Sequence, residues 1–375
     1  MAPDRISNLP DSILCHILSF IPTKHAAATS ILSTSWKSIW LSALTLDFED
    51  KTYKDFNSFQ NAVHTSISSR KTTLPILSFR FKCSKNNSPY WNPKVINAFV
   101  YIATQRKIEN LNINIATKFT PTILNCKTLK VLKLKRLKVE DFSHQVDLPH
   151  LKTLHLHKVY FEHHEYLVIF LSCCPSVEDL QLKRLTIPDY YVTKEKFKAL
   201  PNLIKAMVSY YHDIFSFTLV CNVKTLHVEF SRWRCCTKLP MFHNVTDIEL
   251  KFDSTTSWPN RLNWFLEMLE CCPKLQHFTI QDDVNEDELS DKSWKDPPKV
   301  PKCVSSELRT CYIEGYNGKE FELQFVKYIM QNSKVPRTMT VKCTSSVDIN
   351  DMRQMFMNSF LSTTDSSKCK LLFVQ

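Results

Sequence analysis

Glycine is nearly absent from this chain of 375 residues. There are only two, Gly315 and Gly318, whereas an average usage of ~7% would give about 26. Phosphate-binding loops, dinucleotide-binding turns and nucleophile elbows require glycines at fixed spacings, because other residues cannot make such tight turns or close approaches. The sequence therefore excludes most nucleotide-dependent enzymes and the serine-elbow hydrolases, and we expect no catalytic residue and no cofactor.

Long apolar runs and metal-type cysteine spacings are also missing. The longest apolar stretches, such as YLVIFLSCC at 166–174, are much shorter than the ~20 residues that span a bilayer, and MAPDRISNLPD lacks the apolar stretch of a signal peptide. None of the 14 cysteines forms a Cys-x-x-Cys pair, which excludes zinc-ribbon and thioredoxin-type sites. We expect buried free thiols in a reducing compartment, the cytoplasm, the nucleus or both, without metal or membrane.

Positive charge is in excess. The formal net charge is +11, and residues 101–200 contribute 16 lysines and arginines against 10 acids. Six acids and no base lie between Asp282 and Asp291. Such a balance indicates either a solvated surface with a basic bias or a face for an anionic partner. Nucleic acid is not the expected partner, because the sequence has no recognition helix and no aromatic-lined strand motif.

The first 45 residues have helical periodicity. Pro10 suits a first helical turn, and apolar residues then recur at helical spacing until Pro22. A short alanine-rich helix is predicted at about 24–30, and a third helix carries Trp36 and Trp40 on one face. Three short helices are too small a core to bury two tryptophans and six aliphatic side chains unaided. We expect an apolar face that packs on a partner or on the rest of the chain.

From residue 41 the period changes to a repeat. The pattern apolar-x-x-apolar-x-apolar begins at residues 41, 76, 108, 129, 151, 177, 203, 223, 245, 275 and 308. From residue 108 onward successive starts are 20 to 33 residues apart, the period of a leucine-rich solenoid with one short strand per repeat. Each strand should point its apolar residues inward.

The last 80 or so residues are different again. A proline-rich connector at 295–301 precedes a strand that ends at Ile313 and a turn at 315–318. We predict an amphipathic helix at 319–332 with Phe321, Phe325, Tyr328 and Ile329 inward, a strand at 338–343, a helix at about 348–361 and a strand at 371–374. This small α/β unit can cover the last apolar face of a solenoid.

Specific motifs at both ends carry a family resemblance. Residues 4–40 resemble the F-box of plant F-box proteins through LPD at 9–11, IPT at 21–23, TSILS at 29–33 and the two tryptophans. The tail resembles the FBD domain of the same plants through Trp294, VPKC at 300–303 and IEGYNG at 313–318. With leucine-rich repeats between them, the chain is similar to the plant F-box/FBD/leucine-rich-repeat family. The expected fold is α/β, with a three-helix F-box at 1–45, a leucine-rich-repeat solenoid at 46–290 and a small α/β FBD cap at 291–375.

The resemblance implies a non-catalytic subunit of an SCF-type ubiquitin ligase. The F-box would dock on a Skp-type adaptor, which joins a cullin–RING core, and the repeats would capture an unknown protein substrate. Matched to the family's motif, the adaptor-binding residues are Leu9, Pro10, Ile13, Leu14, Ile17, Pro22, Leu32 and Trp36. The match departs at His25, where the family often has an acid, and at Thr34-Ser35, which replace a usual Lys-Arg pair. Because Skp-type adaptors are acidic, the lost cations predict weaker docking.

The repeat pattern also predicts a substrate surface. Residues that flank the last apolar position of each strand should form columns on the concave side of the solenoid. The strands whose patterns begin at residues 129, 151 and 177 supply a basic patch of Lys133, Lys135, His155, His157 and Lys183. This patch is suited to an acidic or phosphorylated partner. The same lysines could serve solubility alone. Two functions stay open: substrate recognition for ubiquitin ligation, and a non-degradative scaffold whose repeats recognise a protein or a small ligand.

Overall fold

The computed structural model forms two compact units, Met1–Glu195 and Lys196–Gln375. It describes residues 6, 9–139, 146–188, 197–210, 216–230, 239–252, 258–282, 297, 299–332, 334–335, 337–344, 349–360 and 369–374. Most of the predicted acidic segment and part of the predicted connector lie outside these residues. The predicted boundaries at 45/46 and 290/291 remain predictions.

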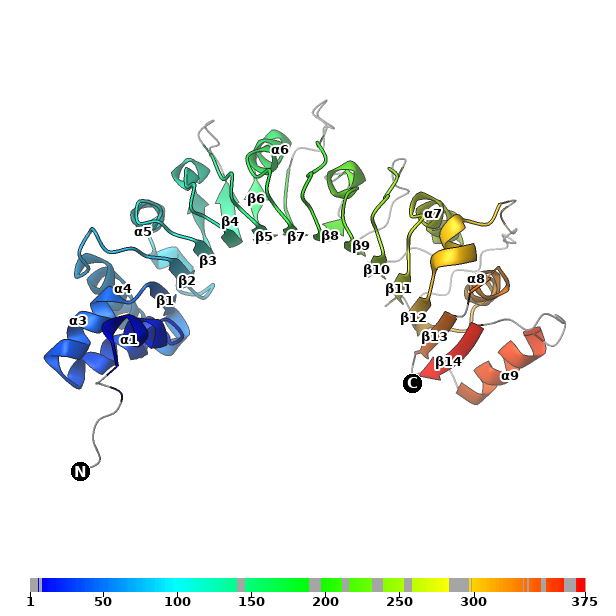
Figure 1. Cartoon of the computed structure of the whole chain (residues 1–375), viewed down its shortest axis with the longest axis horizontal. Coiled ribbons are helices and arrows are strands. Elements are labelled where there is room, and N and C mark those ends of the chain that lie inside the picture. Colours follow the sequence, from blue (N-terminus) through cyan, green and yellow to red (C-terminus); the bar gives the residue numbers. More distant parts are fainter. Residues whose placement is uncertain are drawn as a thin grey trace. The chain divides into compact units, whose positions relative to one another are not determined.

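The first unit combines N-terminal helices with a parallel sheet (Figure 1). Its helices are α1 (Asp11–Leu18), α2 (Thr23–Ala28), η1 (Thr29–Ile31), α3 (Thr34–Ser42), η2 (Asp50–Thr52), α4 (Phe56–Ser68), η3 (Ser88–Tyr90), α5 (Pro93–Thr104), η4 (Pro121–Leu124) and α6 (His164–Ser172). Its strands are β1 (Thr45–Glu49), β2 (Ser78–Lys82), β3 (Asn110–Phe119), β4 (Val131–Val139), β5 (Thr153–His157), β6 (Tyr160–Phe161) and β7 (Asp179–Lys183). The main strands pair in the order β1-β2-β3-β4-β5-β7, while α4, α5 and α6 lie on one side of the sheet.

The strand register confirms the repeat. Two inward positions of every strand stack into two buried columns. The columns are Leu46, Phe79, Leu111, Leu132, Leu154 and Leu180, and Phe48, Phe81, Ile113, Leu134, Leu156 and Leu182. The first repeat corrects the sequence pattern, because Leu46 and Phe48, rather than Leu44 and Leu46, align with Phe79 and Phe81. The sequence offered two overlapping apolar patterns there, and parallel pairing with β2 selects the one that buries Phe48.

A repeated turn leads into the strands. The amide of the first apolar residue donates to the carbonyl three residues earlier, as from Leu151 to Leu148 and from Val177 to Cys174. Cys174 is buried and unbridged, and burial raises the pKa of its thiol well above the usual value. Most of the free cysteines among the described residues are buried in this way, as the sequence predicted. They act as small apolar side chains in the turns and strands.

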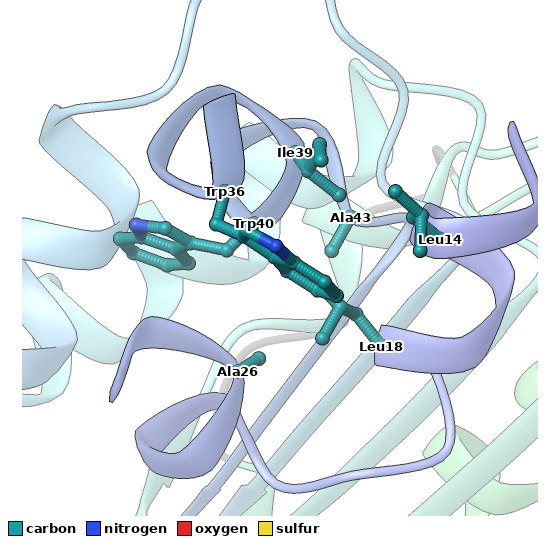
Figure 2. Packing of buried hydrophobic residues seen from close by; sticks show 7 residues of the cluster. All are labelled: Leu14, Leu18, Ala26, Trp36, Ile39, Trp40 and Ala43. Carbon is teal, nitrogen blue, oxygen red and sulfur yellow. The ribbon is translucent and has the colours of Figure 1, made fainter. Parts of the chain in front are cut away.

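The N-terminal helices form a small core of their own. Figure 2 shows Trp36 and Trp40 packed among residues of α1, α2 and α3. The full cluster is Leu14, Leu18, Ala26, Trp36, Ile39, Trp40 and Ala43. Both tryptophans are less than 10% exposed, whereas Leu9, Ile13 and Ile17 of the same module are 37–45% exposed. As the sequence predicted, the three helices do not bury all of their apolar side chains. Small residues such as Ala26 let the helices approach closely enough to enclose the rings.

These helices are also fastened to the first repeat. The guanidinium of Arg70, in the segment after α4, is buried and donates to the carbonyls of Trp40 and Ala43 at the end of α3. Burial, with a smaller contribution from Arg106, lowers the pKa of Arg70 to about 10. From α2, the Thr23 hydroxyl accepts the Asp47 amide of β1 at 2.7 Å. The helical module and the first repeat are therefore packed as one structure.

The second unit continues the same design. Its helices are η5 (Phe217–Val220), α7 (Trp258–Cys271), the π-helical turn η6 (Cys303–Glu307), α8 (Glu320–Gln331) and α9 (Ile349–Phe360), and its strands are β8 (Lys205–Tyr210), β9 (Thr225–Phe230), β10 (Asp247–Phe252), β11 (His277–Asp282), β12 (Thr310–Tyr316), β13 (Arg337–Cys343) and β14 (Cys369–Val374). Pairing is parallel and sequential from β8 to β14. The predicted C-terminal helices and strands are confirmed, although β12 extends to Tyr316 and Phe321 is only half-buried.

Both glycines lie where their conformational freedom is needed. Gly315 and Gly318 have φ values of 83° and 77°, in the left-handed region. Gly315 sits at a register shift of β12, and a Cβ there would lie 1.8 Å from the carbonyl oxygen of Asp282. Gly315 is therefore required both by its left-handed backbone and by its close contact with the end of β11.

Charged side chains are buried beside this turn. Arg261 of α7 is fully buried, pairs with Asp282 at 2.9 Å and lies over the ring of Phe252. Glu322 of α8 is also fully buried, and its carboxylate accepts the amides of Asn317 and Lys319 at 3.0 Å. Burial raises the pKa of Glu322 to about 7 in spite of these hydrogen bonds. Its carboxyl should therefore titrate near neutral pH, far above the range of an ordinary glutamate.

The register can be tested with the same new side chain at two adjacent positions of β4. Leu132→Asp places an unpaired carboxylate in the buried column, which should cost several kcal/mol, a large part of a typical net stability of ~5–15 kcal/mol. Lys133→Asp places it on the opposite face and should cost no more than ~0.5 kcal/mol. Thermal unfolding of the full chain followed by circular dichroism measures both. Similar losses from the two variants would show that the register is wrong.

Glu322 predicts a pH dependence of stability. An unfolded glutamate ionises near pH 4.5, whereas the folded chain keeps the proton until about pH 7. Between these values the native state binds the additional proton, so its stability falls as the pH rises and levels off above pH 7. The difference between wild type and Glu322→Gln in denaturant unfolding should change by about 3 kcal/mol from pH 4.5 to pH 8. A constant difference would contradict the raised pKa.

Candidate functional site

The first helix presents two apolar faces. Leu14 and Leu18 point into the helical core, whereas Ile13 and Ile17 are 45% and 42% exposed. Ile13 and Ile17 are four residues apart and therefore lie on one side of α1. Leu9 and Pro10, just before the helix, are exposed as well. We call Leu9, Pro10, Ile13 and Ile17 the α1 face.

The other predicted adaptor-binding residues are distributed differently. Leu32, after η1, is 67% exposed next to Ile31, while Pro22 is half-buried. Leu14 and Trp36 lie together in the buried core (Figure 2) and can act only by shaping the helices. Phe20, which follows α1 and is 75% exposed, was not among the predicted residues. Its position seven residues after Ile13 is the signal that could have found it.

The residues that depart from the family motif are at the surface. Thr34 and Ser35 are exposed in the first turn of α3, whose N-cap Ser33 accepts the Trp36 amide at 3.3 Å. His25 of α2 is also exposed. None of the three supports the helical core, so their effect is confined to what this surface meets.

The predicted outward columns exist in the first unit. Lys133, His155 and Gln181 are register partners on β4, β5 and β7, and so are Lys135, His157 and Lys183. Neighbouring strands are about 4.8 Å apart, so each column forms a continuous row on the face opposite α4, α5 and α6. The structure thus brings together all five predicted patch residues. In the second unit the corresponding columns mix acids and bases, with His227 Nδ1 2.8 Å from Glu249.

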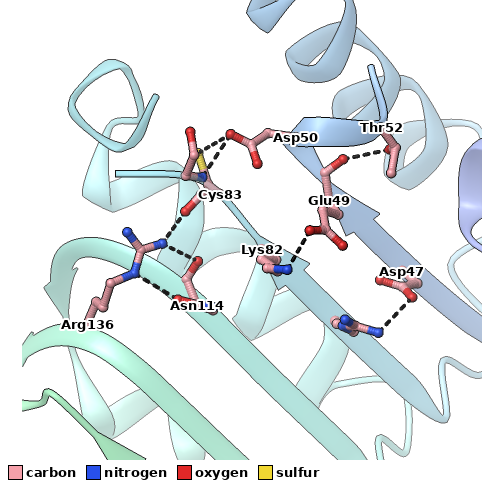
Figure 3. Close-up of polar contacts among 10 residues, drawn as sticks. Asp47, Glu49, Asp50, Thr52, Lys82, Cys83, Asn114 and Arg136 are labelled. Carbon is pink, nitrogen blue, oxygen red and sulfur yellow. Dashed lines mark hydrogen bonds and ion pairs between the residues drawn. The ribbon is translucent and has the colours of Figure 1, made fainter. Parts of the chain in front are cut away.

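Charge is balanced at one end of these columns and not at the other. On β1 and β2, Asp47 pairs with Arg80 at 3.3 Å and Glu49 with Lys82 at 2.5 Å (Figure 3). On β3 the columns carry the amides Asn112 and Asn114. From β4 to β7 they carry lysines, histidines and Gln181, without an acid. The excess positive charge of the first unit's columns is therefore concentrated on three strands.

Two further cations extend this patch. Lys158 and Arg184 are exposed and directly follow His157 and Lys183. Both have left-handed backbone, with φ of 54° and 51°, as has Arg136 after Lys135. We call Lys135, His157, Lys158, Lys183 and Arg184 the edge cluster. The sequence analysis did not include Lys158 and Arg184, although the repeated strings LKLKR, LHLHK and LQLKR at 132–136, 154–158 and 180–184 carry the signal.

Arg136 has a structural role instead. Its Nε donates to the Asn114 side chain at 2.8 Å, and its Nη2 donates to the carbonyls of Asn114 and Cys83 (Figure 3). Asp50 lies on the other side of Cys83, where it accepts the Ser84 amide and the Asn87 side chain. Burial alone would raise the pKa of Asp50, but these hydrogen bonds lower it. Arg136 is thus part of the link between β4, β3 and the loop after β2.

The two histidines of the patch differ. His155 Nε2 lies 3.1 Å from the Asp179 carboxylate. Burial and then Lys135, Lys158, Arg184 and Lys183 lower the pKa of His157. Burial and four nearby cations thus oppose protonation of His157.

Among the residues that the structure describes, no three or more histidines, cysteines and acids are grouped so that they could hold a metal ion. No helix in this part of the chain is long and apolar enough to cross a membrane.

Comparison with family models gives three matches along the chain. Residues 6–45 match the F-box domain, residues 105–198 match the leucine-rich repeats of FBD-associated F-box protein At5g56370, and residues 296–341 match FBD. The chain has the domain organisation of the plant F-box/FBD/LRR-repeat proteins. The F-box match contains the whole helical core and the α1 face, and the repeat match contains the edge cluster.

Curated relatives agree over nearly the whole length. The chain is 29% identical over 400 residues to F-box/FBD/LRR-repeat protein At4g00160 of Arabidopsis thaliana, with 89% of this chain and 85% of the relative covered. It is 28% identical over 444 residues to F-box/FBD/LRR-repeat protein At3g52680 of the same plant, covering 100% and 94%. The predicted family and fold class are thereby confirmed. F-box domains generally bind Skp1-type adaptors, and none of the three matched domains is catalytic.

The surroundings of His157 can be measured directly. In the full chain the His157 ring should titrate below pH 6.5, and Lys135→Met should raise its pKa because a nearby cation is removed. Lys94→Met on α5, which is exposed and away from the columns, is the control and should leave His157 unchanged. NMR titration of the imidazole resonances gives both values. A His157 pKa unaffected by Lys135→Met would place the two side chains too far apart for an edge cluster.

Proposed function

We propose that this chain is the substrate-recognition subunit of an SCF-type E3 ubiquitin ligase. Its F-box docks on a Skp-type adaptor that joins a cullin–RING core, and its repeats hold a protein substrate. The chain itself is non-catalytic. A location in the cytoplasm, the nucleus or both is part of the proposal.

The observation that carries the proposal is the α1 face. The helical module has its own closed core, yet Leu9, Ile13 and Ile17 stay outside it. Phe20, Ile31 and Leu32 of the same helical module are exposed as well. Contiguous exposed apolar residues indicate an interaction site, because their exposure to water is unfavourable. The F-box match supports a Skp-type adaptor as the partner.

The attachment of the helices to the repeats suits such a subunit. Arg70, Thr23 and Lys24 tie the F-box to β1 and its neighbours, with Lys24 Nζ donating to the Thr52 carbonyl at 2.5 Å. A rigid connection holds a substrate bound by the first repeats at a set position relative to the docked adaptor. Ligation of ubiquitin to a substrate lysine depends on such positioning, since the reacting groups must be brought together.

The docking assignment is tested by charges on α1. Ile13→Glu with Ile17→Glu should reduce binding of a recombinant Skp1-type adaptor about a hundredfold or more, because two carboxylates would be desolvated in an apolar interface. Ser12→Glu with His16→Glu adds carboxylates to exposed positions of the same helix and is the matched control. Isothermal titration calorimetry on the full chain measures both, and circular dichroism checks folding.

The outcomes separate the candidate functions. Equal binding by both double variants would remove the α1 face from docking. If docking is lost as expected, the half-life of captured proteins in cells lacking this chain decides between a ligase subunit and a non-degradative scaffold. A lengthened half-life supports ligation, and an unchanged one supports the scaffold.

A further inference from the structure

The edge cluster gathers cations around one point. Lys135 comes from β4, Lys183 from β7, and Lys158 and Arg184 follow β5 and β7. All four act electrostatically on His157, which lies on β5 between the two flanking strands. Three successive repeats therefore direct positive charge to the same edge of the sheet.

The acids beside the cluster are engaged with other cations. Asp179 pairs with His155 at 3.1 Å, and Glu178 pairs with Lys152 at 2.6 Å. Within the described part of the chain, Lys135, Lys158 and Arg184 make no ion pair. On β1 and β2, by contrast, the cations of the same columns each have a carboxylate. Among the described residues, Lys135, Lys158 and Arg184 thus carry positive charge without an ion-pair partner.

This arrangement is unfavourable for the fold alone. Like charges on neighbouring strands destabilise a sheet, and left-handed backbone is costly for residues with a side chain such as Lys158 and Arg184. A bound anion would reverse the sign of the electrostatic contribution.

We propose that the edge cluster binds a phosphorylated serine or threonine of the protein that the chain recruits. The inference rests on the proposed function, because it gives the class of substrate that the repeats recognise. Phosphate carries a charge of about −1.5 to −2 at pH 7 and three acceptor oxygens, which can accept from donors on several strands at once. A carboxylate has a single charge and two oxygens, so it cannot compensate the same number of cations.

Binding should leave a signature on His157. The groups that face its ring are Lys135 on β4, Lys183 on β7, and Lys158 and Arg184 on the segments after β5 and β7. A phosphate dianion among them opposes their effect, so His157 should take up a proton when the phosphorylated segment binds.

The probe is a degenerate library of 15-residue peptides with a central phosphoserine or phosphothreonine. Two matched libraries carry the unphosphorylated residue or glutamate at the centre. The immobilised full chain should retain the phosphorylated library at least tenfold better than either. Lys135→Glu with Lys158→Glu should abolish that preference, whereas Lys94→Glu with Lys127→Glu, an equal change of charge at exposed positions elsewhere, should preserve it. Lys135→Gln with Lys158→Gln removes the charge without reversing it and should weaken retention.

Several results would overturn the inference. These are equal retention of all three libraries, equal loss in both Glu double variants, or competition by inositol hexakisphosphate without any retention of phosphopeptides. The assay contains no adaptor, so its failure leaves the ligase proposal standing. Conversely, phosphopeptide retention by a chain that binds no Skp-type adaptor would refute the ligase proposal alone.

Discussion

The rest of the structure depends on the parallel register of the strands. The same turn precedes β4, β5 and β7, so these strands begin in register with one another. Two inward side chains per repeat therefore stack into continuous buried columns. Each repeat alone is too small to bury its apolar residues, so stability comes from this stacking. The same register fixes which residues face outward and aligns Lys135, His157 and Lys183, which come from distant positions in the sequence.

The N-terminal helices solve a different packing problem. They enclose two tryptophans in a core of seven residues and still leave apolar side chains on the opposite side of α1. The Arg70 guanidinium donates to the backbone carbonyls of Trp40 and Ala43 at the end of α3, where the last carbonyls of a helix lack the usual intrahelical hydrogen bond. These hydrogen bonds also connect the helices to the first repeat. The α1 face and the edge cluster thus both lie on the packed helices and repeats of the first unit.

Electrostatics divide the first unit's outward face. Where charges serve the fold, as on β1 and β2 or at the half-buried Arg136, each has a hydrogen-bonding or ionic partner from a neighbouring strand. On β4 to β7 the cations face one another, and the pKa of His157 falls as a result of burial and of their proximity. Within one sheet, charges that stabilise the fold are paired, and charges that are candidates for binding a ligand face other charges of the same sign.

The sequence alone determined the family, the fold class and the inward residues of ten of the eleven predicted repeat strands, because apolar periodicity and short motifs are local properties. It also predicted the five patch residues, since alternation along a strand assigns faces without knowledge of its neighbours. Only the tertiary structure decided which of the two apolar patterns near residue 44 pairs with β2. Only the tertiary structure showed that Trp36 is buried while Ile13 is exposed, and that Lys158 and Arg184 join the patch. These outcomes depend on strand pairing, helix packing and a left-handed backbone, which arise from contacts between residues far apart in the chain.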